Sequence, residues 1–489
     1  MTSTLRSTPQ QSLPQFNGHL SRNSPRNLRE LPSWYKFLAN EFMDRKMRIG
    51  LLGVEFQGER LLQSENMDIL SGQSVRDPLS WEFNLLGQEN VDIINVKFQR
   101  VSEKVEWGHL FPKWVDEDDV LGPHDCPTIP LPDFGNYKGL NVVVARVPCG
   151  HRNISDVYRL QVNLIVANLL VKCGLDNRDV YSSVYAVFIG ECEPMFEIFR
   201  CNDLLWHQKD VRIYKPSLTK LKQKLVMPIG SCQLARPFAE QGKEIWRRYA
   251  LVAAKRKIYK PRQAYVTVLH SSEANVCGAI TLAQSIIQSN STRDLVLLAD
   301  SSISPRTLRG LQEAGWKIKP IIQPIGERDA YSKLRIWEQL VEYEKVMFVD
   351  SDVVVLKNMD LFFVYPEMSA AKNDGGHFFS SGVMIVEPSR CTFEALMEKI
   401  RYNSSGNEGL LNEMLVWWHR LPMKVNGHKV FTSTSRNQRR VPYGSDSAYQ
   451  RRREVYNNMP RGLREFCASS PKMDAAGQDN KKVERRLKA

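Results

Sequence analysis

The stretch Val346-Met347-Phe348-Val349-Asp350-Ser351-Asp352-Val353-Val354-Val355-Leu356 places two carboxylates between two apolar runs. Four consecutive apolar residues are typical of a strand that is buried on both faces of a parallel sheet. Such a strand accepts a carboxylate only at its end, which is where ligands bind in open α/β sheets. Residues two apart in an extended segment point the same way, so Asp350 and Asp352 are expected to share one divalent cation. The sequence therefore predicts a metal site that holds a diphosphate, with an ordinary solvated loop as the alternative.

The composition is that of a globular protein. A chain of 489 residues is long enough for two or three domains. Its 42% hydrophobic and 25% charged residues exclude a disordered or membrane-embedded class. The net charge of +13 would attract phosphates, nucleic acids or acidic lipids, although such an excess is more often a solvated surface with no dedicated partner.

The cysteines and the apolar runs limit the class further. The nine cysteines include no Cys-x-x-Cys pair, which argues against a zinc ribbon or a thioredoxin-type motif. Their odd number leaves at least one thiol free. No apolar stretch reaches the roughly 20 residues that span a bilayer, and the first residues lack a basic start followed by an apolar run. The chain as given is therefore expected to carry no signal peptide or transmembrane anchor.

The first half of the chain is predicted to form a flexible arm followed by an α/β domain. Residues 1–45 are rich in Ser, Pro, Asn, Gln and Arg, which is typical of an arm without regular structure. Residues 46–250 alternate strand-like and helical patterns and form an N-terminal α/β domain of unclear role. The expected strands are Ile49–Phe56, Val91–Phe98, Leu140–Val147 and Val184–Gly190, and the expected helix is Asp156–Lys172.

From residue 262 the alternation of strands and helices becomes regular, which predicts a mostly parallel sheet with helices on both faces. Ser304 is the expected N-cap of one helix, with Pro305 in its first turn and Gly315 past its end. This second domain is predicted to cover residues 262–435, and residues 445–489 form a basic C-terminal tail. The other expected elements are strands 266–269, 295–298, 318–322 and 346–349, and helices 275–288 and 331–343, the last burying Leu334, Trp337, Leu340 and Val341.

Five short motifs occur in an order that resembles a known family. They are similar to the successive motifs of glycosyltransferase family 8, the glycogenin-like enzymes, and especially to the plant xylan glucuronosyltransferases, once called glycogenin-like starch initiation proteins. Two further segments, Glu387–Phe393 and Trp417–Pro422, strengthen that likeness. The five motifs are Tyr265–Glu273, Ser332-Lys333-Leu334, Phe348–Asp352, Phe379–Met384 and Gly406–Asn412.

The resemblance implies a Rossmann-like, GT-A type nucleotide-sugar-binding domain. It further implies a retaining transfer from a UDP-sugar, with UDP-glucuronate as the expected donor, to a cell-wall polysaccharide such as xylan. Manganese is the implied cofactor, and the Golgi is the implied compartment. Association with other transferases is a further expectation.

The same resemblance assigns roles to individual residues. Asp350 and Asp352 would bind the metal, and Lys333 would add a positive charge at the diphosphate, unless it is an ordinary surface lysine. The turn after residue 268 would hold uridine, unless it is a plain strand-to-helix loop. The sugar and acceptor side would use a polar segment that is otherwise a simple turn. The implied substrate-binding residues are Leu269, His270, Ser271, Ser272, Asn275, Lys333, Ser351, Asn373, Asp374, Ser380, Ser381 and Gly382, and the implied catalytic residues are Asn407 and Glu408.

Several of these positions depart from the family pattern. Relatives read Gly-Asp-Gln-Gly where this chain reads Gly406-Asn407-Glu408-Gly409, so the carboxylate is moved by one residue. Ser380 replaces an Asn, and Asn275 replaces a Tyr that stacks on the nucleotide. The family's His-x-x-Gly-x-Lys-Pro-Trp motif, which completes the metal site, is absent, and the dipeptide at 428–429 lacks its Gly, Pro and Trp. The transferase domain is therefore expected to lack its last segment.

Two functions remain open from the sequence, and a third is not expected. The first is a metal-dependent glycosyltransferase that uses a UDP-sugar. The second is a catalytically weakened or inactive relative that acts as a scaffold or partner of active transferases. Nucleic-acid binding through Arg451-Arg452-Arg453 or Lys481–Lys488 is not expected, because these segments carry few aromatic residues to stack on bases.

Overall fold

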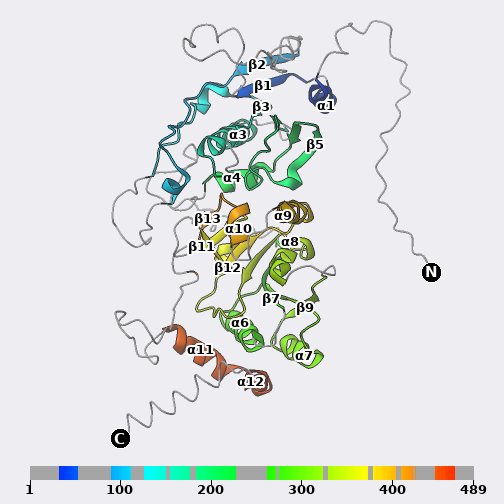
Figure 1. Cartoon of the computed structure of the whole chain (residues 1–489), viewed down its shortest axis with the longest axis vertical. Coiled ribbons are helices and arrows are strands. Elements are labelled where there is room, and N and C mark those ends of the chain that lie inside the picture. Colours follow the sequence, from blue (N-terminus) through cyan, green and yellow to red (C-terminus); the bar gives the residue numbers. More distant parts are fainter. Residues whose placement is uncertain are drawn as a thin grey trace, which may run out of the picture. The chain divides into compact units, whose positions relative to one another are not determined.

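The protein is a mixed α/β structure built on two sheets, which confirms the predicted fold class (Figure 1). Both sheets combine parallel with antiparallel pairs of neighbouring strands. The computed structural model describes residues 32–43, 45–52, 90–111, 126–149, 155–176, 183–226, 261–270, 275–322, 329–372, 378–402, 409–421, 425 and 447–468.

The first sheet has the strand order β2-β1-β3-β4-β6-β5. Its four expected strands are all present. Three have shorter bounds than the apolar runs, whereas β1 begins two residues before its run, and residues 53–56 of that run lie outside the described part of the chain. The hairpin β5–β6 was not expected, because its residues show neither clean alternation nor a continuous apolar run. The strands are β1 (Met47–Leu52), β2 (Val91–Asn95), β3 (Val142–Arg146), β4 (Tyr185–Ile189), β5 (Leu204–Gln208) and β6 (Val211–Tyr214).

Two helices belong to the region of this sheet, α3 (Val157–Asp176) and α4 (Leu218–Val226). Helix α3 confirms the predicted helix and extends it by four residues. Asp156 begins it, because its Oδ1 accepts a hydrogen bond from the amide of Tyr158 at 2.8 Å. Most α3 side chains are buried and join one core with the inner faces of β3 and β4.

Helix α1 (Ser33–Phe42) lies inside the segment that was expected to be a flexible arm. Its side chains Trp34, Tyr35, Leu38 and Phe42 are buried, so the expectation is wrong for these residues. The prolines that suggested an arm precede the helix, and the last of them, Pro32, occupies its N-cap position. Residues 1–31 lie outside the described part of the chain.

The second sheet has the strand order β13-β11-β12-β10-β7-β8-β9. Strands β7, β8 and β9 follow one another outward, and β10 then returns to the other side of β7, parallel to it. The strand order therefore reverses between β7 and β10. The strands are β7 (Gln263–Leu269), β8 (Asp294–Ala299), β9 (Lys317–Pro320), β10 (Lys345–Val349), β11 (Ser369–Lys372), β12 (Phe379–Val386) and β13 (His419–Arg420).

One helix of this sheet matches the start and end signals predicted from the sequence, and another does not. In α7 (Pro305–Glu313) the N-cap Ser304 accepts a hydrogen bond from the amide of Thr307, and Gly315 has φ +112° beyond the end, as predicted. The expected helix 331–343 is instead a 3-10 turn, η8 (Asp329–Leu334), and a short α8 (Arg335–Gln339). Since α8 ends early, Val341 is 46% exposed and not buried as expected. The remaining helices are η9 (Asp360–Val364), α6 (Val276–Gln288), α9 (Arg390–Tyr402) and α10 (Gly409–Met414).

Two C-terminal helices, α11 (Ser447–Asn458) and α12 (Arg461–Ala468), form the described part of the expected basic tail. Both contact α6, and α12 also contacts α7 (Figure 1). Their buried side chains Val455, Met459 and Leu463 show that this segment packs as folded structure. The proposed domain boundaries at 46–250, 262–435 and 445–489 remain predictions.

Three disulfides join described cysteines: Cys149–Cys192, Cys201–Cys391 and Cys277–Cys467. Among the described cysteines, Cys173 is buried and forms no disulfide, and its thiol donates a hydrogen bond to the carbonyl of Tyr137 at 3.0 Å. Within the described ranges, no helix combines the length and the hydropathy needed to cross a bilayer.

A pair of tryptophans joins the cores of the two sheets. Trp417 packs in the core of the first sheet, whereas its neighbour Trp418 packs in the core on one face of the second. The carboxylate of Glu197 fixes this segment, because its Oε1 accepts hydrogen bonds from the amides of Val416 (3.0 Å) and Trp417 (3.4 Å). The Trp417–Pro422 motif therefore has a structural role at this junction.

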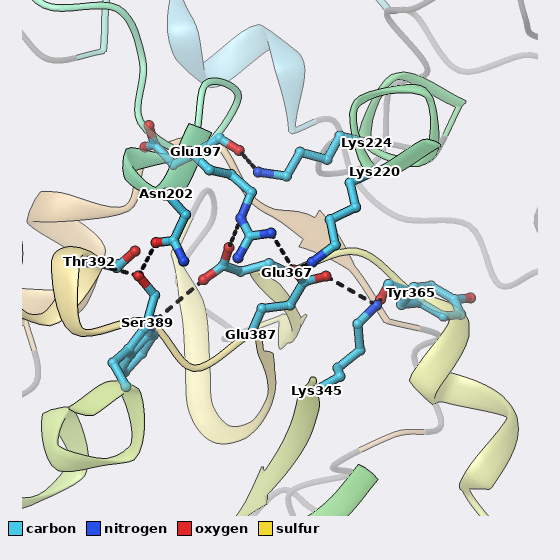
Figure 2. Close-up of polar contacts among 12 residues, drawn as sticks. Glu197, Asn202, Lys220, Lys224, Lys345, Tyr365, Glu367, Glu387, Ser389 and Thr392 are labelled. Carbon is cyan, nitrogen blue, oxygen red and sulfur yellow. Dashed lines mark hydrogen bonds and ion pairs between the residues drawn. The ribbon is translucent and has the colours of Figure 1, made fainter. Parts of the chain in front are cut away.

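Charged residues meet at this junction in a set that we call the junction cluster. Five of its members are buried, and the sixth, Lys220, has a side chain that is 43% exposed. The cluster consists of Arg200 together with Lys220, Lys224, Lys345, Glu367 and Glu387, the last five labelled in Figure 2. Glu387 lies at its centre. Its carboxylate is 2.8 Å from Arg200 Nη1, 2.8 Å from Lys220 Nζ and 3.5 Å from Lys345 Nζ. Arg200 Nε is also 3.5 Å from Glu367, so one guanidinium bridges two carboxylates.

The cluster shifts the ionisation of its members. Burial alone would raise the pKa of Glu387, but the charges of Lys345, Arg200 and Lys220 outweigh it and lower that pKa to about 2. Burial lowers the pKa of Lys224 to about 8, and its ammonium donates a hydrogen bond to the carbonyl of Glu197. The disulfide Cys201–Cys391 crosses the same junction, directly after Arg200 in sequence. Charge pairs and a covalent bond thus hold the same interface.

We expect Glu387→Gln to lower the free energy of unfolding at pH 7 by about 3–5 kcal/mol, because it leaves buried cations without their partner. The folded pKa of about 2 lies below the ordinary 4.5, so the wild type should lose stability as the pH falls from 4.5 towards 2. The variant should lose less over that range. Urea unfolding at pH 7 and pH 3 measures both effects.

Glu454→Gln is the matched control for this prediction. Glu454 pairs with Arg451 on α11, but its side chain is 62% exposed. Its replacement should change stability by less than about 0.5 kcal/mol. Equal effects of the two substitutions would show that the junction cluster does not stabilise the fold.

Candidate functional site

Asp350 is the first residue after β10 and lies at the carboxyl edge of the second sheet. Its amide donates a hydrogen bond to the carbonyl of Gly382 in β12 at 2.9 Å. On the other side of β10, strand β7 ends at Leu269 and leads to His270. The strand order reverses between these two strands, and open α/β sheets bind ligands in the crevice at such a point.

The two aspartates belong to a turn and not to an extended segment. The amide of Val353 donates to the carbonyl of Asp350 at 3.1 Å, which closes a four-residue turn. The expectation that both side chains share one face through strand alternation is therefore wrong. Asp350 is partly buried and Asp352 is exposed, so the turn presents two differently solvated carboxylates beside the crevice.

Lys333 contacts the partly buried carboxylate. Its Nζ lies 2.9 Å from Asp350 Oδ1 and 3.4 Å from Ser381 Oγ, and it stands 4.8 Å from the centroid of the Phe348 ring. The side chain of Lys333 is 29% exposed, so it is held at the strand end and does not extend freely into solvent. The turn of η8 thus brings a cation to the end of β10.

Helix α6 packs against the turn through two contacts that the sequence did not predict. A Cβ added to Gly278 would lie 2.4 Å from the carbonyl oxygen of Ser351, so helix and turn touch with no side chain between them. Further along, Ser285 Oγ accepts a hydrogen bond from the amide of Val355 at 3.0 Å. The only available signal was a glycine near the start of a helix, which is unfavourable there without a packing reason.

Asn412 holds the start of β12. Its amide group makes two hydrogen bonds with the backbone of Phe379, accepting at 2.8 Å and donating at 3.0 Å. This pairing fixes the residues that follow, Ser380 and Ser381. Asn412 is the last residue of the Gly406–Asn412 motif, and these hydrogen bonds give it a structural role.

The structure brings together only some of the predicted site residues. Asp350, Lys333, Ser381 and Gly382 are in direct contact, and Ser351 lies in the turn. Leu269 is buried, His270 is half-buried, and Ser380 Oγ accepts from the amide of Gly382 at 3.3 Å. Asn275 is exposed at the N-cap of α6 and makes no capping hydrogen bond with its side chain. The predicted residues outside the described part of the chain are Ser271, Ser272, Asn373, Asp374, Asn407 and Glu408.

The turn offers oxygen donors to a divalent cation. Among the described residues, no three His, Cys, Asp or Glu side chains gather in one place. Asp350 and Asp352 supply hard carboxylate oxygens, which suit Mg²⁺ or Mn²⁺ when phosphate and water fill the remaining positions. The residues present therefore fit a cation that binds together with a diphosphate.

Comparisons with known proteins agree on one family. Residues 61–232 match the model of the GUX1-5 N-terminal domain. UDP-glucuronate:xylan alpha-glucuronosyltransferase 2 of Arabidopsis thaliana is 41% identical over 78% of this chain and 72% of its own. A second Arabidopsis protein, described as putative UDP-glucuronate:xylan alpha-glucuronosyltransferase 4, is 37% identical over 91% of this chain and 84% of its own.

More distant matches cover only part of the chain. Human glycogenin-1 is 31% identical over 32% of this chain and 49% of its own. Among solved structures, the apo form of the bifunctional glycosyltransferase WbbM covers 34% of this chain and 40% of its own, at 16% identity and a TM-score of 0.30. A score this low adds nothing to the argument from sequence.

We expect Gly278→Ala to displace the Asp350–Asp352 turn, because its Cβ would overlap the carbonyl of Ser351. Overpacking of this kind typically costs about 1–3 kcal/mol, which exceeds the gain of roughly 0.5–1 kcal/mol from Ala over Gly inside a helix. Chemical unfolding of the variant measures the balance.

Gly462→Ala in α12 is the matched control, since nothing lies within 4 Å of its added Cβ. It should leave stability unchanged or raise it slightly. A Gly278→Ala variant that is as stable as this control would contradict the close approach of α6 to the turn.

Proposed function

The chain belongs to the family of plant UDP-glucuronate:xylan glucuronosyltransferases, and from this we propose that it transfers glucuronate from UDP-glucuronate to xylan or a related cell-wall polysaccharide. The observation that carries the proposal is the pairing of Asp350 with Lys333 at the reversal of strand order between β7 and β10. A carboxylate and a cation at this edge suit a bound nucleotide diphosphate.

We propose distinct roles for the groups around the turn. Lys333 would move from Asp350 to an oxygen of the diphosphate and stabilise the charge that grows on the leaving UDP. The turn from Leu269 to Ser272, with Asn275, would hold the nucleoside. Ser380, Ser381 and Gly382 of β12, together with Asn373 and Asp374, would face the sugar and the acceptor.

Asp350 and Asp352 would hold the divalent cation, which we propose to be Mn²⁺. When bound, such an ion supplies positive charge to both phosphates and orients them. The ion pair with Lys333 already occupies one oxygen of Asp350, so cation and lysine compete for this carboxylate until a diphosphate is present. We therefore expect the cation and UDP to bind cooperatively.

We propose that Glu408, in the Asn407-Glu408 pair, supports catalysis at the sugar. The neutral amide of Asn407 carries no negative charge to stabilise a cationic transition state, whereas the carboxylate of Glu408 does. The shifted carboxylate and the absent His-x-x-Gly-x-Lys-Pro-Trp motif favour a second candidate function. In that alternative the chain does not turn over a UDP-sugar and acts as a partner of active transferases.

The disulfides support a compartment for this activity. Such bonds form and persist in oxidising compartments such as the lumen of the secretory pathway. We propose that the protein works in the Golgi lumen, where a polysaccharide acceptor and a nucleotide sugar meet.

Isothermal titration with UDP tests the site. UDP should bind in the presence of Mn²⁺ and lose most of its affinity with a chelator. The isosteric variant Asp350→Asn, Asp352→Asn should abolish the Mn²⁺-dependent part, because the neutral amides remove both negative charges. Glu394→Gln, an exposed carboxylate on α9, should bind as the wild type does. UDP binding that is indifferent to chelator and to the aspartates would overturn the assignment.

A second experiment separates the enzyme from the scaffold. Transfer to xylan should be faster with UDP-glucuronate than with UDP-glucose or UDP-xylose. Glu408→Gln should reduce kcat by about 10²–10³-fold, the usual loss when one charge-stabilising group is removed, and should leave UDP affinity intact. No transfer with any of these donors, despite Mn²⁺-dependent UDP binding, would favour the scaffold.

A further inference from the structure

We propose that the C-terminal helices α11 and α12 brace the Asp350–Asp352 turn through helix α6, with the disulfide Cys277–Cys467 as the positioning contact. The proposal rests on the proposed function only in that the turn is the place where diphosphate binds. The geometry of the proposed metal-binding aspartates would thus depend on residues about a hundred positions away in sequence.

The first link is the start of α6. Cys277 is the second residue of this helix, and its disulfide ties it to Cys467 near the end of α12. The next residue, Gly278, is the one that meets the turn: its hypothetical Cβ would lie 2.4 Å from Ser351 O and 3.6 Å from the Cα of Asp352. The covalent anchor and the contact with the turn are therefore adjacent residues of one helical turn.

The second link is the packing of α12 across two helices. The ring of Phe466 lies on α7, so close that a Cβ at Gly310 would be 2.6 Å from it, and the guanidinium of Arg306 stands 6.0 Å from the ring centroid. Met459 and Leu463 share a core with Val276 and with Val355, which follows the turn. Helix α12 is thus held on α7 and α6 together, and Figure 1 shows these helices side by side.

The third link is the hydrogen bond from Val355 to Ser285, which holds the far side of the turn to the same helix. Helix α6 therefore touches the segment 351–355 at two places, seven residues apart. A close-packed contact transmits displacement, because no flexible side chain lies between backbone and backbone at Gly278. If the first turn of α6 moves, the carbonyl of Ser351 must move with it, and the flanking aspartates follow.

The experiment compares the wild type with Cys277→Ala, Cys467→Ala in the full chain, by UDP titration with Mn²⁺ and by hydrogen exchange of the segment 350–356. We expect the Kd for UDP to rise about fivefold, a typical size for coupling through a packed network. Hydrogen exchange of the amides in residues 350–356 should become at least about tenfold faster, because the disulfide no longer opposes local opening. Exchange in β3 and β4 should not change.

Steady-state kinetics adds a readout that general destabilisation would not produce. At a temperature well below unfolding, the KM for the donor should rise while kcat stays within about twofold, because the aspartates bind and do not react. Cys149→Ala, Cys192→Ala, which removes a disulfide beside the first sheet, is the matched control and should leave Kd, KM and the exchange of 350–356 unchanged.

Each remaining outcome decides the proposal. Kd and exchange within twofold of the wild type in the folded Cys277→Ala, Cys467→Ala variant would overturn the brace, as would equal effects in the control. If that variant does not fold, Phe466→Ala, which keeps the disulfide and removes the ring from Gly310, is judged by the same two measurements. If the wild type binds no UDP, the proposed function fails, and the exchange rates alone decide whether α12 braces the turn.

Discussion

The burial of strand β10 on both sides is the constraint on which the rest of the structure depends. Its five residues are all buried between β7 and β12, so ionisable groups stand at its two ends and nowhere between them. At one end Lys345 meets Glu387 in the junction cluster, and at the other Asp350 meets Lys333. One short strand thus connects the interface of the two sheets with the crevice where a diphosphate would bind.

The junction gives the first half of the chain a role beyond its own sheet. Glu197 holds the backbone at Trp417, Arg200 bridges Glu367 and Glu387, and Cys201 is bonded to Cys391. Breaking a buried pair by removing one partner costs far more than an exposed pair contributes. The N-terminal sheet is therefore a structural part of the region that carries the site, even though it contributes none of the predicted ligands.

Sequence patterns predicted what depends on neighbouring residues. The buried run ending at Asp350, the cap at Ser304 and the periodicity of α3 are local signals, and each appears in the structure. The sequence did not predict the closed turn Asp350–Val353, because a turn and the end of a strand have the same residue pattern between two apolar runs. Gly278 and Ser285 were missed because their importance lies in contacts about 70 residues away, which no periodicity encodes. The family resemblance added residue roles, but not the supporting contacts of Asn412 or of α12.

The disulfides Cys201–Cys391 and Cys277–Cys467 each span 190 residues, and this separation governs how the protein can be made. At a synthesis rate of about 5–20 residues per second, the earlier cysteine of each pair waits roughly 10–40 s for its partner. During that interval other thiols, including Cys173, can compete for it wherever conditions are oxidising. Each long-range pair is therefore open to non-native pairing while the chain grows, and protein made in a reducing host should lack both cross-links.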